Sequence, residues 1–335
     1  AYGLRNDSPT VTDANIVLGR IDPEKPIGGK LHRLDEDAAS KEIDLHVGTP
    51  LRLDTLQAAE AILRVANSLI AGAIRLVSIE RVFDPNKFAF MPFGGGGALH
   101  AGAMLADVGI ARAIVPRYPG VTSAMGCVIA DMRQDFVQTI NSLVSTLDER
   151  SLADFMQAHV DQGLALLDAA RTTFDAKQLS FELDMAYIGQ THTVSVPLAV
   201  KVDGHVVTAP GRQEIEEAFD GAYARTFGRL LKNGVRRIIN LRSTVTGKRP
   251  KFDLKTLAPA TTGDVKPKNY RPVHFGDKWH DTAIYDRLDL PVRTVIDGPA
   301  ILEQPDTTVL IEPHLYGRID GFGNTIIEPK PEETS

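Results

Sequence analysis

The clearest ligand-binding feature of this 335-residue chain is a run of four glycines, Gly94, Gly95, Gly96 and Gly97. The run joins an apolar stretch at 88–93, which predicts a short buried strand, to an Ala-, Leu- and Met-rich stretch at 98–108, which predicts a helix. Glycine leaves room for a flat ring or a phosphate to approach the main chain, and a helix start presents unpaired N–H groups. The pattern therefore predicts a nucleotide-binding loop, with a tight ligand-free turn as the alternative.

Asp13 and Asn15 form a second polar group, just before the apolar residues 16–18. A carboxylate or an amide at such a place either caps a helix or lines a cleft. Thr10 and Thr12 are also good helix caps, so a capping cluster and a binding cleft both stay open at this point.

The nine histidines lack metal-binding spacings such as HxH or HExxH, and the sequence predicts no metal site. His100 follows the glycine run by three residues and is close enough to meet the edge of a ligand, although packing within a helix is the preferred interpretation. The single cysteine, Cys127, lies among apolar residues, which predicts a buried structural thiol. One cysteine excludes an internal disulfide and favours a reducing compartment.

The overall composition indicates an ordered protein, with 43% hydrophobic and 24% charged residues. The formal net charge of −6 comes without a basic stripe or tail, so nucleic acid is not an expected partner. No stretch approaches the roughly 20 apolar residues that span a membrane, and no signal peptide opens the chain. The sequence therefore predicts no membrane association and, by default, a cytoplasmic location.

A long amphipathic helix is expected before the glycine run. It begins after Asp54, a predicted N-cap with Gln57 three residues on, and ends before Asp84-Pro85. The order helix, strand, glycine loop, helix is typical of a nucleotide-binding lobe.

The rest of the chain mixes helices and strands. Its patterns predict a strand at 110–115, a helix within 145–174, paired strands within 179–200, a helix at 212–227, a linker at 258–269 and a strand-rich region at 271–329.

Several segments match one known family in order and spacing. They are Tyr2-Gly3, Pro9–Asn15, Ala73–Arg81 with Asp84-Pro85, the glycine run and Pro119–Gly126 with Ala130-Asp131, followed more weakly by Ala186–Gln190, Trp279, Tyr285–Arg287 and Gly298–Glu303. In these segments the chain resembles the hydantoinase A/oxoprolinase family over most of its length.

The resemblance implies an α/β fold class, α+β overall. It places part of an actin-like, sugar-kinase-like ATPase lobe at 1–140, a helix-and-strand region at 141–257 and a small β-rich domain at 270–330. It also implies ATP and Mg²⁺ as cofactors, with the glycine loop near adenosine, and it favours the cleft for Asp13 and Asn15. No catalytic residue is assigned.

The chain departs from the family pattern at a few positions. Arg5 and Asn6 stand where the family tends to have glycines, and Ala1 stands where it tends to have Cys, so any backbone contact there is in doubt. In the glycine loop, Gly96 replaces a frequent Ala and Ala98 a frequent Pro, which loosens the loop.

The resemblance also implies a reaction class. Members open cyclic amides such as hydantoins or 5-oxoproline with ATP, or carboxylate ketones such as acetone and acetophenone, usually together with a larger B-type subunit. Both reactions phosphorylate a carbonyl or enol oxygen, which lowers the barrier of the next step. Cyclic-amide hydrolysis is the first hypothesis, ketone carboxylation the second, and a non-catalytic assembly subunit the third.

The two glycine-rich, aspartate-bearing phosphate loops of the family have no counterpart in this sequence, and neither does a GxxxxGK[ST] loop. We therefore expect a C-terminal portion whose ATP and Mg²⁺ site is completed by a missing N-terminal part, with a naturally split subunit as the alternative. Either case predicts little ATPase activity from this chain alone, and the choice of substrate cannot be read from it.

Overall fold

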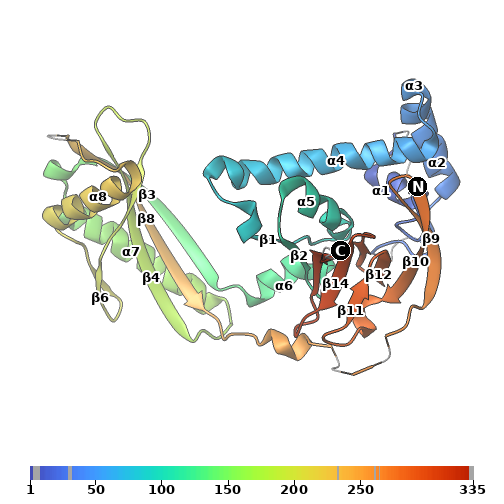
Figure 1. The fold of residues 1–335 in the computed structure, drawn as a ribbon. Helices are drawn as coiled ribbons and strands as arrows, with labels where there is room; N and C mark the ends of the chain where they lie inside the picture. Colours follow the sequence, from blue (N-terminus) through green and yellow to red (C-terminus); the bar gives the residue numbers. More distant parts are fainter. Residues whose placement is uncertain (3–7, 29–31, 232–233, 260–261, 264, 332–335) are drawn as a thin grey trace. The chain divides into compact units, whose positions relative to one another are not determined.

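The computed structural model describes residues 1–2, 8–28, 32–231, 234–259, 262–263 and 265–331 (Figure 1). Gly3, Arg5, Asn6 and part of the expected 258–269 linker lie outside the described residues. The chain divides into two compact units, Ala1–Cys127 with Asp253–Ser335, and Val128–Phe252, and each is described by itself.

The first unit opens with helices whose starts are capped by local side chains. They are α1 (Val11–Val17), α2 (Glu36–Ile43), a π-helical turn (Asp44–Gly48), α3 (Thr49–Leu51) and α4 (Thr55–Val77). Asp54 accepts from the N–H of Gln57, and the Gln57 side chain accepts from the N–H of Asp54, so the predicted cap is confirmed. The small residues Ala58 and Ala59 on α4 let the backbone of that helix approach α1 closely.

Much of α4 faces away from the core. Val65 and Leu69 are 62% and 71% exposed. Together with the turn that follows it, at Thr55–Arg81, the helix is long and apolar enough to cross a membrane by length and composition alone, contrary to the expectation that no stretch approaches this length. A single helix of this kind is weak support for a membrane span. That the protein does not associate with a membrane stays a prediction.

The glycine run connects a strand to a helix, as predicted. Strand β1 (Ala89–Phe90) is shorter than the expected 88–93, because Pro92 has no N–H for a sheet ladder. A 3₁₀ turn (Gly97–His100) and helix α5 (Ala101–Val108) lead to strand β2 (Arg112–Val115), which pairs parallel to β1.

The C-terminal strands complete this sheet. They are β9 (Asn269–Phe275), β10 (Lys278–Asp286), β11 (Val295–Asp297), β12 (Ala300–Gln304), β13 (Thr307–Ile311), β14 (Leu315–Ile319) and β15 (Thr325–Pro329). Strand β15 pairs antiparallel with β2, with Ile326 opposite Ile114, which gives the order β1-β2-β15-β14-β11. A second sheet has the order β13-β12-β10-β9. The strand-rich region therefore shares a sheet and a core with the glycine loop instead of forming a third consecutive unit.

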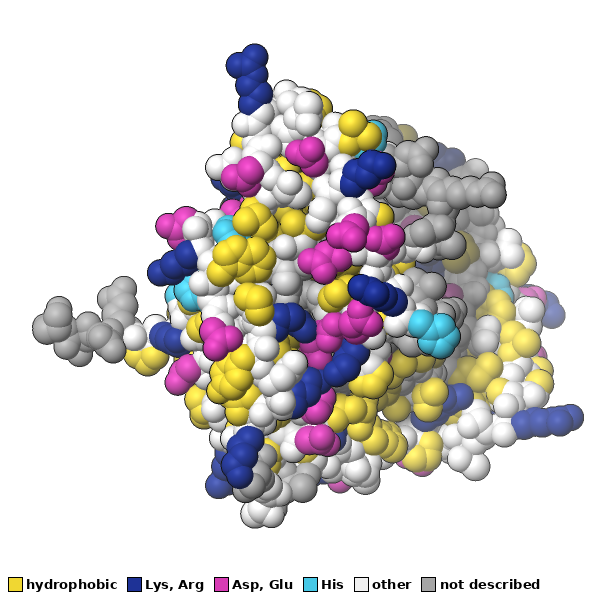
Figure 2. Space-filling view, turned by 90° about the vertical axis from the view of Figure 1, so that its right-hand side faces the viewer, with side chains coloured by type: hydrophobic (Ala, Val, Ile, Leu, Met, Phe, Trp, Pro, Cys, Tyr) yellow, Lys and Arg dark blue, Asp and Glu magenta, His cyan; other side chains and the backbone are white. Residues whose placement is uncertain are grey.

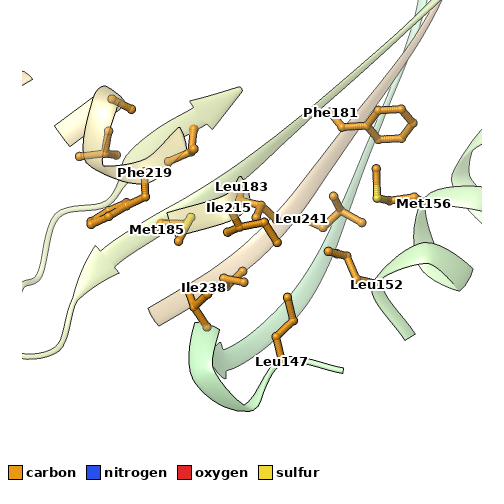
Figure 3. Close-up of a cluster of buried hydrophobic side chains, with 14 of the residues drawn as sticks. Leu147, Leu152, Met156, Phe181, Leu183, Met185, Ile215, Phe219, Ile238 and Leu241 are labelled. Atoms are coloured by element: carbon orange, nitrogen blue, oxygen red, sulfur yellow. The ribbon is translucent and has the colours of Figure 1, made fainter. Parts of the chain in front are cut away.

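The second unit is an antiparallel sheet covered by two helices. Its elements are β3 (Met132–Leu143), α7 (Glu149–Ala169), β4 (Ala176–Tyr187), β5 (Val194–Pro197), β6 (Lys201–Asp203), β7 (Val206–Thr208), α8 (Arg212–Phe227) and β8 (Arg236–Lys248). The main sheet has the order β3-β8-β4-β5, and β6 and β7 pair as a hairpin. Figure 3 shows Met156 of α7 and Phe219 of α8 among the side chains of Phe181, Met185 and Leu241 from the sheet.

The helix at 212–227 and the α/β fold class are confirmed. The burial predicted for Cys127 is wrong. Its helix, α6 (Thr122–Ile129), has no buried residue, and the thiol is exposed. On the face of the molecule shown in Figure 2, the described Lys and Arg side chains lie among Asp and Glu side chains.

Candidate functional site

A pocket of about 390 Å³ lies in the first unit, beside the glycine loop. Residues of α1 and its flanks line it together with Pro26, Ile27 and the loop itself. Of the predicted site residues, the pocket brings together Gly95, Gly96, Gly97 and Asn15.

Two predicted site residues are placed elsewhere. Neither Gly94 nor Asp13 is among the lining residues of the pocket. None of the described lining residues is an Asp, Glu, Lys or Arg, so the pocket suits a neutral group better than a phosphate.

The backbone of the glycine loop explains why glycine is needed at two of its positions. Gly94 has a φ of +81°, which side chains with a Cβ rarely adopt. At Gly95, an added Cβ would lie 2.9 Å from a methyl carbon of Ile27. At Gly96, with an ordinary φ of −103°, an added Cβ would meet nothing within 4 Å, so Gly96 leaves space open beside the pocket.

The turn between β12 and β13, together with the first residue of β13, forms hydrogen bonds with the glycine loop and with two other segments. The Thr307 hydroxyl lies 3.0 Å from the carbonyl oxygen of Gly95, to which it donates. The carbonyl of Pro305 accepts from the N–H of Gly28 at 2.9 Å, and Asp306 accepts from the N–H of Gly120 at 2.9 Å. Residues 305–307 thus contact three segments of the chain, at Gly28, Gly95 and Gly120, although the sequence indicated only a turn at 306–308.

The buried Arg287 fixes the strands beneath that turn. Its guanidinium donates to the carbonyl oxygens of Val115 and Pro116 at 2.9 and 2.6 Å, and to the side chains of Gln304 and Thr325 at 2.7 and 3.0 Å. Burial lowers the pKa of Arg287 to about 10, so the side chain stays charged at neutral pH. Arg287 therefore joins β2, β12 and β15, which carry the loop and its support.

Asn15 lines the pocket, and its buried side chain holds an acceptor without a described partner. Its side chain is 1% exposed, and its Nδ2 donates to the carbonyl oxygen of Val11 at 2.9 Å. A carbonyl oxygen only accepts, so this contact orients the amide and leaves Oδ1 as the free atom. Oδ1 has no hydrogen-bond partner among the described residues, and such a buried acceptor costs roughly 1–3 kcal/mol while it is unpaired.

Asp13 acts as a helix cap in the structure. Its carboxylate accepts from the N–H and the hydroxyl of Thr10 at 2.7 and 2.6 Å, and from the Ala1 amino group at 2.6 Å. Burial by itself would raise the pKa of the Asp13 carboxyl, but these hydrogen bonds outweigh it and hold the pKa below its ordinary value. The capping alternative describes these contacts, and a nucleotide-binding role for Asp13 stays a prediction.

For His100 the sequence favoured packing within a helix over contact with a ligand. It lines the pocket, and its Nδ1 lies 2.6 Å from Oδ1 of Asn67 on α4. Because an amide oxygen only accepts, Nδ1 carries the proton and Nε2 keeps its lone pair. Burial lowers the pKa of the His100 imidazole, and the positive charge of Arg20 lowers it further. Asn67 lies in the middle of α4, where an asparagine is unfavourable. This was the feature of the sequence that could have indicated a contact made by its side chain.

The described residues contain no cluster of three or more His, Cys, Asp or Glu side chains suited to a metal ion. None of the described residues that line the pocket has a carboxylate to hold Mg²⁺. What the arrangement can do is hold a flat, neutral ring among apolar side chains, beside the imidazole of His100.

Comparison with known families covers nearly the whole chain. The hydantoinase/oxoprolinase family model matches residues 1–136, and the model of the hydantoinase/oxoprolinase C-terminal domain matches residues 134–328. The chain belongs to the hydantoinase/oxoprolinase family. The two family models meet near the first domain boundary predicted from the sequence, at 140.

Relatives in the hydantoinase/oxoprolinase family carry different activities in their names. The acetophenone carboxylase gamma subunit of Aromatoleum aromaticum is 30% identical in an alignment of 345 positions that covers 98% of this chain and 46% of the relative. The 5-oxoprolinase of Dictyostelium discoideum is 26% identical over 94% of this chain and 25% of its own length. The crystal structure of ATP-dependent caprolactamase from Pseudomonas jessenii matches with a TM-score of 0.70 and 26% identity, over 98% of this chain and 48% of that one. The chain thus spans about half the length, or less, of these family members.

Proposed function

We propose that this chain is part of an ATP-dependent enzyme that opens a cyclic amide, with the pocket beside the glycine loop holding the base of the nucleotide. The observation that carries the proposal is a pocket beside the glycine loop whose described lining is free of charged side chains. Such a pocket suits a neutral, flat group such as the base of a nucleotide. The likeness to 5-oxoprolinase and to an ATP-dependent caprolactamase supports the reaction class.

The chemistry of this reaction explains the need for ATP. The amide oxygen attacks the γ-phosphorus, the bond to ADP breaks, and the phosphorylated carbonyl carbon becomes a better electrophile for water. After water adds, the C–N bond breaks, the ring nitrogen leaves as an amine, and a second water releases phosphate. The products are the ring-opened acid, ADP and phosphate. In this scheme the residues of the chain bind and orient the nucleotide, while its phosphates and Mg²⁺ are held by a part of the enzyme outside this chain.

Ketone carboxylation is the second candidate, because the acetophenone carboxylase gamma subunit is 30% identical over nearly the whole chain. In that reaction ATP would phosphorylate an enol oxygen or the bicarbonate partner. A B-type partner subunit is proposed for either reaction, since relatives are named as subunits of larger enzymes.

The test is ATP turnover by the full-length subunit together with its partner subunit. Hydantoin, 5-oxoproline and caprolactam are compared with acetone and acetophenone in the presence of bicarbonate. Release of ADP that depends on one cyclic amide supports the proposal, and release that depends only on a ketone with bicarbonate selects the second candidate. No turnover and no ATP binding would leave the assembly role.

A valine at Gly96 provides the sharpest variant for this test. Because an added Cβ at Gly96 meets nothing within 4 Å, Gly96→Val fills the open space beside the pocket without straining the loop. At Gly95 the same change would also push Ile27 aside. Gly72→Val is the matched control, since Gly72 on α4 also has nothing within 4 Å and does not line the pocket. We expect turnover to be lost in Gly96→Val and kept in Gly72→Val.

A further inference from the structure

We propose that an apolar groove between the end of α4 and strand β1 is covered, in the full-length subunit, by an extended apolar segment from the part of that subunit that lies outside this chain (Figure 1). The groove has a volume of about 320 Å³ and shares none of its described lining residues with the pocket beside the glycine loop. The inference concerns the assembly of the subunit, so it does not depend on which reaction the enzyme catalyses.

The lining of the groove is almost wholly apolar. It includes Ile74, Val77, Phe83, Phe88, Phe90 and Met91. Ser78, the one polar side chain in the described lining, already donates to the carbonyl oxygen of Ile74 at 2.7 Å. The groove therefore offers an occupant apolar contact and little hydrogen bonding by side chains.

Large apolar side chains of the groove lie open to water within this chain. Phe83, Phe88 and Met91 are 52%, 50% and 52% exposed. The rings of Phe83 and Phe88 contact each other edge to face, with their centroids 5.9 Å apart. Soluble proteins rarely leave a contiguous apolar patch uncovered. These side chains therefore mark a surface that another segment covers.

One side of the groove belongs to the hydrophobic core of the first unit. Ile110, which lines the groove, is 6% exposed and is part of the core cluster that includes Met104 and Val115. Ile74 and Phe90 also line the groove and pack against the same cluster. The core thus continues to the surface at this place, as in obligate interfaces, which resemble a domain core cut in half. Such a surface suits a permanent occupant better than a partner that dissociates.

Strand β1 lies at an open edge of its sheet. Among the described strands it pairs only with β2, and it ends the order β1-β2-β15-β14-β11. Ala89 and Phe90 of this strand line the groove, so the free edge and the groove adjoin. A strand added at this edge would bond to the backbone of β1 while its alternate side chains fill the groove. The occupant is therefore an extended segment with apolar residues at alternate positions.

The length of the relatives favours another part of the same subunit as the source of this segment. The match to caprolactamase covers 48% of that chain, and the match to the acetophenone carboxylase gamma subunit covers 46% of that relative. A segment of the same polypeptide stays at a high effective concentration and cannot diffuse away. This is what a surface continuous with the core requires.

Hydroxyl-radical footprinting of the wild-type full-length subunit tests the inference, because it reads the exposure of phenylalanine side chains without any substitution. Phe83 and Phe88 are compared with Phe322 and Phe155, which are 41% and 37% exposed and do not line the groove. The subunit unfolded in urea gives the intrinsic rate at each position. We expect the two groove side chains to react at least about tenfold more slowly than the two references, and close to the rate of the fully buried Phe219.

The state of the sample identifies the occupant. Protection in the subunit by itself, independent of its concentration, supports the inference. Groove side chains that react as fast as the references would overturn it. So would protection that appears only with the partner subunit, only with added lipid vesicles, or only as the subunit concentration rises, since each result assigns the groove to a different occupant.

Photocrosslinking from the groove identifies the covering segment. A photoreactive benzoylphenylalanine in place of Phe88 is activated in the full-length subunit, and the cross-linked peptide is identified by mass spectrometry. We expect a peptide from outside this chain. A peptide from residues 128–252 or from the partner subunit would overturn the inference.

Discussion

The imidazole Nδ1 of His100 lies 2.6 Å from the side-chain oxygen of Asn67, which joins the turn after the glycine loop to the middle of α4. The contact sets the tautomer of the ring and leaves Nε2 free at the pocket. A residue 33 positions away thus sets the tautomer of a side chain that lines the pocket.

The lowered pKa of His100 predicts a loss of stability in mild acid. The folded state holds the imidazole neutral, so the unfolded chain takes up a proton first as the pH falls below the ordinary value of about 6.5. The stabilisation is complete above that pH and is lost as the pH falls toward the lowered pKa of the folded state. Replacement by glutamine, His100→Gln, is therefore expected to flatten the dependence of unfolding free energy on pH between 7.5 and 5.5.

Fluorescence of Trp279, the single tryptophan, is the measurement for this prediction because it reports on the first unit. The choice of signal matters, since burial also lowers the pKa of His159 in the second unit. An equally steep pH dependence in the variant would assign the effect to another group.

Thr307 is expected to position the glycine loop through its hydroxyl. Thr307→Val removes the donor to the carbonyl oxygen of Gly95, and we expect nucleotide affinity to fall about fivefold, as for one hydrogen bond of about 1 kcal/mol. Thr307→Ser keeps the hydroxyl and should retain most of the affinity. Titration of ATP into both variants of the full-length enzyme is the measurement, and equal losses in the two would show that the methyl group of Thr307, rather than its hydroxyl, matters.

Arg287 should be the most costly single side chain to remove from the first unit. Arg287→Met leaves buried acceptors on β2, β12 and β15 without a donor, and a loss of about 3–5 kcal/mol in unfolding free energy is expected. Arg287→Lys, which keeps the charge and some donors, should lose less. Urea unfolding followed by Trp279 fluorescence measures both, with the exposed Arg81→Met as control. A loss below about 1 kcal/mol in Arg287→Met would contradict this assignment.

Two glycines within helices of the second unit should respond to alanine in opposite directions. An added Cβ at Gly163 on α7 would lie 2.5 Å from a methyl carbon of Val245, and the crowding should cost about 1–3 kcal/mol. At Gly221 on α8 the nearest atom is 3.5 Å away, at the end of the Arg225 side chain, so alanine should stabilise by up to about 1 kcal/mol.

Hydrogen exchange of the amides in α7 and α8 is the measurement, since Trp279 lies outside this unit. Adding Val245→Ala to Gly163→Ala should return part of the lost stability by making room for the new methyl group. If the double variant is as unstable as the sum of the two single changes, contact with Val245 is not the cause.

Local patterns were sufficient for much of the secondary structure. The Asp54 cap on α4, the helix after the glycine run and the bounds of α8 all depend on residues within a few positions of one another. Hydrogen bonds of a capping box and a 3.6-residue apolar period are set by near neighbours, so they are visible in the sequence.

The composition of the site was decided by contacts between distant segments. Thr307 reaches Gly95 across 212 positions, and β15 pairs with β2 although more than 200 residues separate them. No local pattern encodes such pairings, because they depend on which surfaces the folded chain brings together. The sequence by itself determined that a glycine loop joins a strand to a helix, whereas for Asp13 and Asn15 it left a helix cap and a cleft open. Only the tertiary structure decided that Asn15 and His100 line one pocket while Asp13 caps α1, since burial and hydrogen-bond partners are properties of the folded chain.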